Sequence, residues 1–459
     1  MLSLTDVLRG TGGELAPGFE GDTTFARGVI DSRDLQPGDL FIALKGEHVD
    51  GHDFIPHAIA SHAAGIIAAR PPGAIPNKLA YVQVSDTLRA LQDLGAYKLR
   101  QVDPLVIGIT GTVGKTSTKE IVAGTLGQRK PVLKTVRNLN TEIGVPLSLL
   151  GIEPRHEIAV LEMGMYVPGD IRFLAELARP RIGIVTMVGH MHAERAGSIE
   201  RIAEAKAELV DGLPRDGLAI LNGDNSYTAA MANRGRRALL FGLEETNDVR
   251  ATEVESRGLE GIAFRLEHRG ASEPVELSLL GRHSTYHALA AAAVMLSLDY
   301  SLADTAAALR NFEGEPLRLH IVAGIDATTI IDDTYNSSPP AAEAALALLA
   351  EMPRARQRIA VLGDMRELGQ YSAELHRQVG QAAARVADLL ITVGEEARLI
   401  AEGAREAGLT KDRVIVTTTP DEATAQLRPR LGSGNYLLVK GSLATGLQAV
   451  VKAFLAGPA

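Results

Sequence analysis

The sequence contains no cysteine, which excludes disulfides, a thiol nucleophile and cysteine metal sites and is typical of a reducing compartment. It has no surplus of basic residues: its formal net charge is −9, which argues against a nucleic-acid partner. It has no apolar run of about 18 residues, so we expect no membrane insertion. Its start shows no signal peptide, and no low-complexity segment or repeat occurs. These absences indicate a soluble, cytoplasmic globular protein.

The chain is long enough for about three domains, with 459 residues of which 46% are hydrophobic. Residues 1–85 mix short strands with turns. Residues 86–315 alternate apolar strands with helices, which predicts a mostly parallel sheet covered by helices. Residues 316–459 restart the same alternation, which predicts a second doubly wound, Rossmann-like domain. The predicted fold class is therefore α/β with three domains.

The stretch VIGITGTVGKTSTKE, residues 106–120, is typical of a phosphate-binding loop with altered spacing. The usual pattern, G-x-x-x-x-G-K-[ST], would need a glycine at position 109, where the chain has isoleucine. An apolar strand precedes the loop and a helix follows it, an arrangement that points backbone N–H groups at an anion. We expect Lys115 to bind nucleotide phosphates and Thr116 to bind Mg²⁺. The alternative is an ordinary strand-to-helix turn with an exposed lysine.

Two further positions lie where a parallel sheet places its ligands. Glu162 ends the predicted strand EIAVLE, where a carboxylate suits a hard Mg²⁺ ion. His190 and His192 follow another strand. The alternative for Glu162 is an acid that simply meets water, and histidines at such positions usually serve packing or the surface.

Lys206 falls on the apolar face of a predicted helix, SIERIAEAKAELV. The apolar residues at helical spacing on that face are Ile199, Ile202, Ala203, Leu209 and Val210. A core-facing lysine is costly unless it is paired, neutral or modified. Periodicity alone favours a simpler interpretation, in which the stem covers apolar surface and the ammonium reaches water.

Seven ordered motifs along nearly the whole chain resemble the Mur ligase family. GITGTVGKTSTKE resembles the ATP loop of that family, whose glycine spacing differs from the usual one in the same way. The other motifs are DSRDLQPGDLFIALKGEHVDGHDFI, NLNTEIGVPLSLL, EMGMYVPGDI, GHMHAERAGSIERIAEAKAEL, IIDDTYNSSP with VLGDMRELG, and VKGS. Their order and spacing are most similar to the branch of the family that uses D-alanyl-D-alanine.

The resemblance implies a fold and a reaction. It implies an N-terminal UDP-substrate-binding α/β domain, a central P-loop ATPase domain and a C-terminal Rossmann-like domain that closes over the site. ATP would phosphorylate the terminal carboxylate of UDP-N-acetylmuramoyl-tripeptide, and the amine of D-alanyl-D-alanine would attack the acyl phosphate. The implied cofactors are ATP and Mg²⁺, and we expect a monomer that takes part in peptidoglycan precursor synthesis.

The resemblance also implies roles for individual residues. The catalytic positions would be Lys115, Glu162, His192 and Lys206. The metal ligands would be Thr116, Glu162, His192 and Lys206, with Lys206 carbamylated. The ATP-binding positions would be Gly111, Thr112, Val113, Gly114, Lys115, Thr116, Ser117, His287, Arg318 and Asp333. The substrate-binding positions would be Ser32, Arg33, Asn138, Asn140, Thr141, Asn336 and Lys440.

The chain also departs from the family pattern at several positions. Thr141, Thr186, Met187, Ser284 and His287 stand where the family commonly has asparagine, or close to such a position. Three alternatives to the predicted function stay open. The first is a P-loop switch or motor, although the chain has no N-K-x-D motif. The second is a non-catalytic relative. The third is a sister ligase that adds a different amine, such as folylpolyglutamate synthase.

Overall fold

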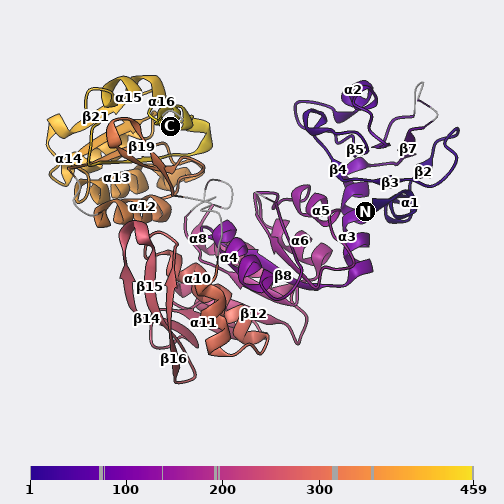
Figure 1. The fold of residues 1–459 in the computed structure, drawn as a ribbon, viewed down its shortest axis with the longest axis horizontal. Helices are drawn as coiled ribbons and strands as arrows, with labels where there is room; N and C mark the ends of the chain where they lie inside the picture. Colours follow the sequence, from indigo (N-terminus) through magenta and orange to yellow (C-terminus); the bar gives the residue numbers. More distant parts are fainter. Residues whose placement is uncertain are drawn as a thin grey trace.

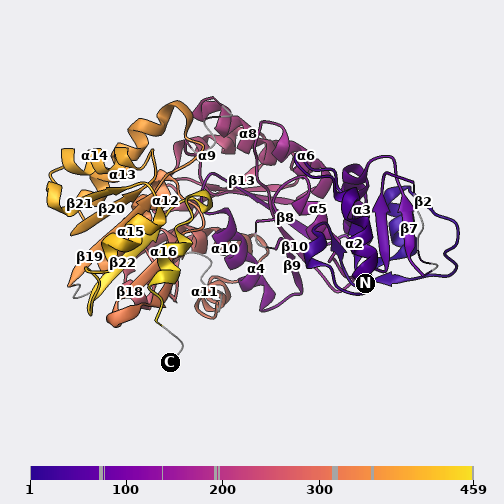
Figure 2. The ribbon, with the colours of Figure 1, turned by 90° about the horizontal axis from the view of Figure 1, so that it is seen from above.

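The computed structural model describes residues 2–71, 76, 78–136, 138–190, 194, 197–312, 319–352 and 356–456. Figures 1 and 2 show three α/β bodies in chain order, with the middle one between the other two. Each body contains its own larger sheet, which confirms the predicted fold class. The boundaries at residues 85 and 315 remain predictions, and the second lies outside the described residues. No helix in the described ranges is long and apolar enough to cross a membrane.

The first body has a five-stranded sheet of order β2-β7-β6-β5-β4, parallel except for β2. Its strands are β2 (Glu14–Leu15), β4 (Gly28–Val29), β5 (Leu40–Ile42), β6 (Gly65–Ala68) and β7 (Ala80–Gln83). β1 (Leu2–Ser3) and β3 (Thr24–Phe25) form a separate pair. The helices are α1 (Leu4–Thr11), α2 (Ile55–Ala60), α3 (Thr87–Val102) and the short turns η1 (Ser32–Asp34) and η2 (Gly51–Phe54).

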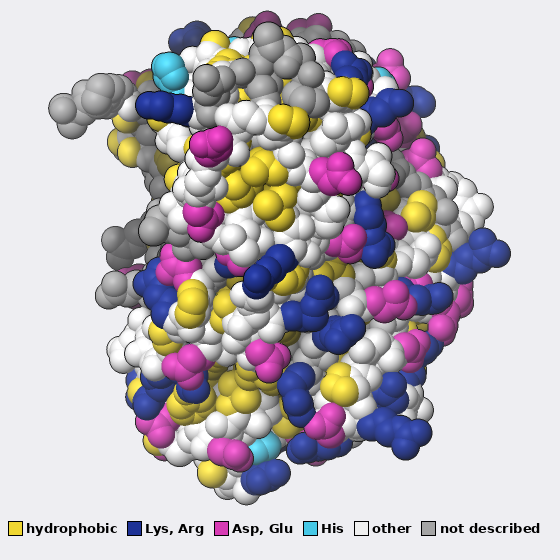
Figure 3. All heavy atoms as spheres, turned by 90° about the vertical axis from the view of Figure 1, so that its right-hand side faces the viewer, with side chains coloured by type: hydrophobic (Ala, Val, Ile, Leu, Met, Phe, Trp, Pro, Cys, Tyr) yellow, Lys and Arg dark blue, Asp and Glu magenta, His cyan; other side chains and the backbone are white. Residues whose placement is uncertain are grey.

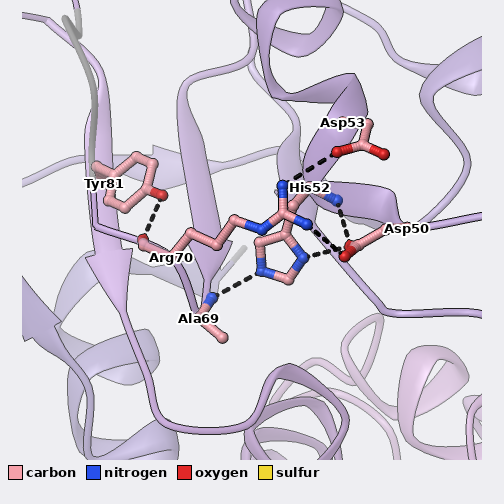
Figure 4. Close-up of polar contacts among 6 residues, drawn as sticks. All are labelled: Asp50, His52, Asp53, Ala69, Arg70 and Tyr81. Atoms are coloured by element: carbon pink, nitrogen blue, oxygen red, sulfur yellow. Dashed lines mark hydrogen bonds and ion pairs between the residues drawn. The ribbon is translucent and has the colours of Figure 1, made fainter.

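A polar network ties η2 to the end of β6 (Figure 4). His52 Nε2 accepts from the Ala69 N–H at 2.9 Å, so the ring proton lies on Nδ1 and is donated to Asp50 Oδ1 at 2.6 Å. Arg70 donates to Asp50 at 2.6 Å and to Asp53 at 3.0 Å. The network therefore fixes the loop geometry of the first body with one defined histidine tautomer.

The middle body has a nine-stranded sheet of order β16-β15-β14-β13-β12-β11-β8-β10-β9. Its strands are β8 (Leu105–Thr110), β9 (Val132–Lys134), β10 (Ile158–Glu162), β11 (Ile182–Val185), β12 (Leu218–Asn222), β13 (Arg237–Gly242), β14 (Val249–Ser256), β15 (Ile262–His268) and β16 (Ala271–Leu277). The pairs from β9 to β14 are parallel, as predicted, whereas β14, β15 and β16 form an antiparallel extension that was not predicted.

The helices of the middle body cover this sheet. They are α4 (Lys115–Gly127), α5 (Gly144–Leu149), α6 (Asp170–Ala178), α8 (Ile199–Asp211), α9 (Ser226–Ala230), α10 (Ser284–Ser297) and α11 (Leu302–Arg310), with short turns η3 (Met231–Asn233) and η4 (Gly258–Glu260). Ile107 and Ile109 of β8 share one core with Ile121 and Val122 of α4, which fixes the helix against the strand. The predicted order of strand, loop and helix is confirmed.

The third body has a six-stranded sheet of order β17-β18-β22-β19-β20-β21, parallel except for β17. Its strands are β17 (His320–Ala323), β18 (Thr329–Asp333), β19 (Gln357–Gly363), β20 (Leu389–Val393), β21 (Val414–Thr417) and β22 (Asn435–Lys440). Its helices are α12 (Pro339–Glu351), α13 (Ser372–Ala384), α14 (Arg398–Glu406), α15 (Pro420–Leu427) and α16 (Gln448–Ala453), with short turns η5 (Ile325–Ala327), η6 (Gly369–Tyr371), η7 (Lys411–Arg413) and η8 (Leu443–Thr445). Helices lie on both faces of the sheet, so this domain is doubly wound, as predicted (Figure 1).

The face that the first body turns outward carries basic and acidic side chains side by side (Figure 3). This mixture of signs matches a chain with a modest negative net charge.

Candidate active site

The glycine-rich loop between β8 and α4 has a geometry that only glycine fits. Gly111 has φ +150°, and a Cβ there would lie 1.9 Å from Thr186 Oγ1. Gly114 has φ +87°, and a Cβ there would lie 2.5 Å from His287 Cε1. Ile109 is buried inside β8, where it pairs with strands on both sides. The loop therefore starts two residues later than in the usual pattern, which explains its unusual spacing.

Lys115 and Thr116 begin α4 at this loop. Lys115 Nζ donates to the carbonyl oxygens of Gly111 at 2.8 Å and Thr112 at 3.4 Å. Thr116 Oγ1 donates to Glu162 Oε2 at 3.0 Å. The ammonium and the hydroxyl therefore lie at the N-terminal end of α4, where the backbone favours an anion.

Glu162 is the last residue of β10 and is buried. Its second carboxylate oxygen, Oε1, accepts from Asn140 Nδ2 at 2.8 Å, and Lys119 Nζ lies 3.8 Å from Oε2. The alternative of an acid facing water is wrong, because this carboxylate is held within the site. Lys119 was not predicted, although it follows Lys115 by one helical turn.

Lys206 lies on α8 with only 1% of its surface exposed. Burial, and then the charge of Lys115, hold the pKa of Lys206 well below its ordinary value. No carboxylate among the described residues forms an ion pair with it. The interpretation in which its ammonium reaches water is therefore wrong, because the side chain is buried, and this burial disfavours the charged form.

A cavity of about 370 Å³ lies between the middle and third bodies, beside the phosphate loop. His287 lines it, and its Nδ1 lies 3.1 Å from Thr118 Oγ1. Ser284 also lines it and donates to the Leu280 carbonyl at 2.8 Å. The other lining residues include Thr186, Met187, Asn222, Asp224, Asn225, Phe241, His283, Tyr286, Phe312 and Leu319. Apolar walls with a few polar groups suit a nucleoside.

Asp333 reaches this cavity from the third body. Its Oδ2 accepts from Lys440 Nζ at 2.5 Å, while its Oδ1 is buried with no partner among the described residues. A buried carboxylate oxygen without a partner is costly, so a ligand hydroxyl or amine is expected there. Lys440 is fully buried and also donates to the Asn336 carbonyl at 2.9 Å, so it holds Asp333 in place.

A second cavity, of about 440 Å³, lies on the other side of the loop. The middle body contributes Thr112, Val113, Gly114, Lys115, Thr116, Asn138, Asn140, Thr141, Glu162, Gly164, Met165 and Tyr166. The third body contributes Tyr335, Asn336, Ser337, Ser338, Ala341, Arg366, Glu367, Ser442, Leu443 and Ala444. We call this cavity the reaction cleft. Arg366, Glu367, Ser338 and Ser442 are lining residues that were not predicted.

The structure brings together most, but not all, of the predicted site residues. Ser32 and Arg33 lie on η1 of the first body, where Arg33 pairs with Asp31, and they line neither cavity. His192 and Arg318 lie outside the described residues. Within the described ranges no group of three His, Asp or Glu side chains could hold a metal ion, so the metal ligands remain a prediction.

Thr186 fastens the phosphate loop, because its Oγ1 donates to the Val113 carbonyl at 2.6 Å. We expect Thr186→Val, which keeps the shape and removes the donor, to lower stability by about 1 kcal/mol and to weaken binding of an ATP analogue. Thermal unfolding and calorimetric titration measure both. Thr252→Val is the matched control, since it loses a hydrogen bond to Glu267 outside either cavity. Unchanged nucleotide affinity in Thr186→Val would contradict the role of this hydroxyl.

The fold and the site together define an ATP-dependent ligase with three domains. Its features are the phosphate loop, the buried carboxylate beside it and the Rossmann-like domain that faces them. The chain belongs to the Mur ligase family. Three family models match it: the catalytic domain at residues 29–98, the middle domain at 109–295 and the glutamate ligase domain at 317–443.

Relatives with assigned names match along nearly the whole chain. UDP-N-acetylmuramoyl-tripeptide–D-alanyl-D-alanine ligase of Escherichia coli (strain K12) is 36% identical and covers 98% of this chain and 97% of its own. The crystal structure of MurF from Acinetobacter baumannii has a TM-score of 0.86 at 30% identity and covers 98% of both chains. That of MurF ligase from Thermotoga maritima in complex with ADP has a TM-score of 0.79 at 30% identity, covering 93% of this chain and 96% of its own.

Proposed function

We propose that this protein is the ATP-dependent ligase that joins D-alanyl-D-alanine to UDP-N-acetylmuramoyl-tripeptide in peptidoglycan precursor synthesis. The observation that carries the proposal is the contact of Thr116 with Glu162 at the head of α4, inside a cleft that the third body completes. The near full-length similarity to ligases of this name supports the same acceptor amine rather than that of a sister ligase. It also favours an enzyme over a P-loop switch.

The chemistry follows from the poor reactivity of a carboxylate. Transfer of the γ-phosphoryl group to the tripeptide carboxylate forms an acyl phosphate, which supplies a leaving group. The amine of the dipeptide then forms the new C–N bond as phosphate leaves. The chain contributes charge and position: the loop N–H groups and Lys115 bind the phosphates, and closure of the third body over the cleft would exclude water from the acyl phosphate.

The residues in place fit a bound Mg²⁺ ion, since Thr116 Oγ1 and Glu162 Oε2 lie 3.0 Å apart beside the loop and are oxygen atoms of the kind that Mg²⁺ prefers. When bound, the ion would neutralise phosphate charge. We propose His192 and Lys206 as further ligands, as the family resemblance implies. A neutral Lys206 can attack CO₂ through Nζ, forming an N–C bond and releasing a proton. The resulting carbamate would supply oxygen atoms for the ion in place of a costly buried amine.

We also propose that the enzyme is a cytoplasmic monomer. One chain carries the phosphate loop, the nucleotide cavity and both walls of the reaction cleft, so no second copy is needed to complete the site.

The test of the proposed function is coupling between substrates. We expect ADP to accumulate only when UDP-N-acetylmuramoyl-tripeptide is present, because phosphoryl transfer needs its carboxylate. Product should form only when D-alanyl-D-alanine is added as well. Phosphate release and product mass measure the two steps. Rapid ATP hydrolysis by the protein alone, indifferent to both substrates, would contradict the proposal, as would faster ligation of lysine, diaminopimelate or glutamate.

A further inference from the structure

The loop at residues 364–369, part of the sequence VLGDMRELG, follows β19 at the edge of the third sheet that faces the phosphate loop. In open α/β sheets, ligands bind beyond the carboxyl ends of strands where the strand order reverses. β18 and β19 are consecutive in the chain but separated by β22 in the sheet, so the reversal occurs here.

The loop is anchored at its base. Asp364 and Met365 are buried: Asp364 Oδ1 accepts from the Ala397 N–H at 2.8 Å, and the Met365 N–H donates to His376 Nε2 at 3.1 Å. His376 Nδ1 donates to the Ser372 carbonyl at 2.8 Å, and burial lowers the pKa of His376. The imidazole therefore stays neutral and keeps Nε2 available as the acceptor.

Two charged side chains project from this fixed base into the reaction cleft. The Arg366 side chain is 57% exposed, and its guanidinium lies 3.3 Å from the Asp364 carboxylate, which restrains it. Glu367 has φ +66°, a left-handed conformation that costs energy in a residue other than glycine. Such backbone strain persists where the surrounding structure fixes the residue, and here it fixes the direction of the Glu367 side chain.

Two buried hydroxyls belong to the same wall. Ser338 Oγ and Ser442 Oγ are buried, line the reaction cleft and have no hydrogen-bond partner among the described residues. Buried polar atoms of this kind are usually satisfied by a ligand or by water. Opposite Lys115, this wall therefore lines the cleft with a cation, an anion and two hydroxyls that have no partner within the described part of the chain.

We propose that this wall binds the acceptor dipeptide as a zwitterion, with Arg366 on its carboxylate and Glu367 on its ammonium. The proposal rests on the proposed function and adds the residues that select the acceptor. A planar guanidinium suits a carboxylate. Opposite charges on neighbouring residues match a ligand whose two charges are one peptide unit apart. Lys115 and Glu162 are the other charged residues that line the cleft in the described part of the chain, and both belong to the phosphate side.

The experiment compares two acceptors that differ in one charge: D-alanyl-D-alanine and D-alanyl-D-alaninamide, which lacks the carboxylate. We expect Arg366→Gln to lose about 10- to 100-fold in kcat/KM with the dipeptide and to change little with the amide. Glu367→Gln should lose a similar factor with both acceptors, since both carry the ammonium. The KM for ATP should be unchanged in each variant.

Arg398→Gln is the matched control, an exposed arginine of α14 that pairs with Glu402 and lines neither cavity. It should match the wild type with both acceptors. Glu367→Asn provides a second variant, because asparagine tolerates the left-handed backbone and still removes the charge. Equal losses with both acceptors in Arg366→Gln, or a raised KM for ATP, would overturn the proposal and assign Arg366 to the phosphates. A wild-type enzyme that ligates neither acceptor would instead contradict the proposed function.

Discussion

Replacing Lys206 by alanine should abolish ligation and leave the fold intact, and acetate or propionate should restore part of the activity. The ammonium form is disfavoured at this position, because the side chain is buried and lies near the charge of Lys115. Alanine removes the carbamate that we propose as a metal ligand, and a small carboxylate can fill the vacated space. Ligation rates at increasing carboxylate concentration measure the rescue.

The control for this rescue is a second buried lysine. Lys98 of α3 is mostly buried and pairs with Asp6 at 3.4 Å in the first body, remote from the phosphate loop. Lys98→Met should keep its activity and show no response to acetate. Removing bicarbonate should slow the wild type but not the rescued Lys206→Ala enzyme. Full activity of Lys206→Ala without added carboxylate would rule out the carbamate, as would a resolved structure with a bare ammonium at Lys206.

The sequence was sufficient to predict those features of the fold and of the site that depend on a local pattern of residues. Alternating apolar strands and helices predicted the parallel sheets, because each strand buried on both faces must be uniformly apolar. Helical spacing placed Lys206 on the same face as Ile202 and Leu209, and that face is buried. Glu162 was predicted at a strand end, and it is the final residue of β10.

The parts that were missed depend on contacts between distant segments. The antiparallel strands β14 to β16 continue a sheet that the alternation predicted as mostly parallel. The two-residue turn Arg269-Gly270 between β15 and β16 is a local hairpin signal, but the pairing of β14 with β13 in the main sheet has no such signal. The third-body wall of the reaction cleft combines the loops that follow β18, β19 and β22. The first and last of these loops are more than 100 residues apart in the chain. The position of Arg366 and Ser442 in the cleft therefore depends on how the domains pack, which the sequence pattern does not show. The sequence showed that Thr186 departs from the family pattern. It could not show that the Thr186 hydroxyl donates to the Val113 carbonyl, because that contact joins two separate loops.

Changing Lys115 to alanine should lower the rate of ligation by about 10²–10³, mainly in kcat, because one preorganised charge is lost from the transferred phosphoryl group. The unfolding temperature should change little, since the half-buried Lys115 Nζ donates to carbonyls of its own loop, on Gly111 and Thr112. Steady-state kinetics and thermal unfolding measure the two effects. Lys134→Ala is the control, an exposed lysine of β9 that pairs with Glu120.

Carboxylate rescue separates the two lysines of the site. Lys115 acts as a cation, whereas Lys206 is proposed to act as an anion after modification, so acetate should restore Lys206→Ala and leave Lys115→Ala inactive. The loss of Lys115 also removes a charge that lowers the pKa of Lys206, so less of Lys206 should be in the neutral form that captures CO₂. Lys115→Ala should therefore bind less CO₂ at Lys206 than the wild type, which carbon-13 NMR of the carbamate measures. A normal ligation rate in Lys115→Ala, or its recovery with acetate, would show that this ammonium does not bind the phosphates.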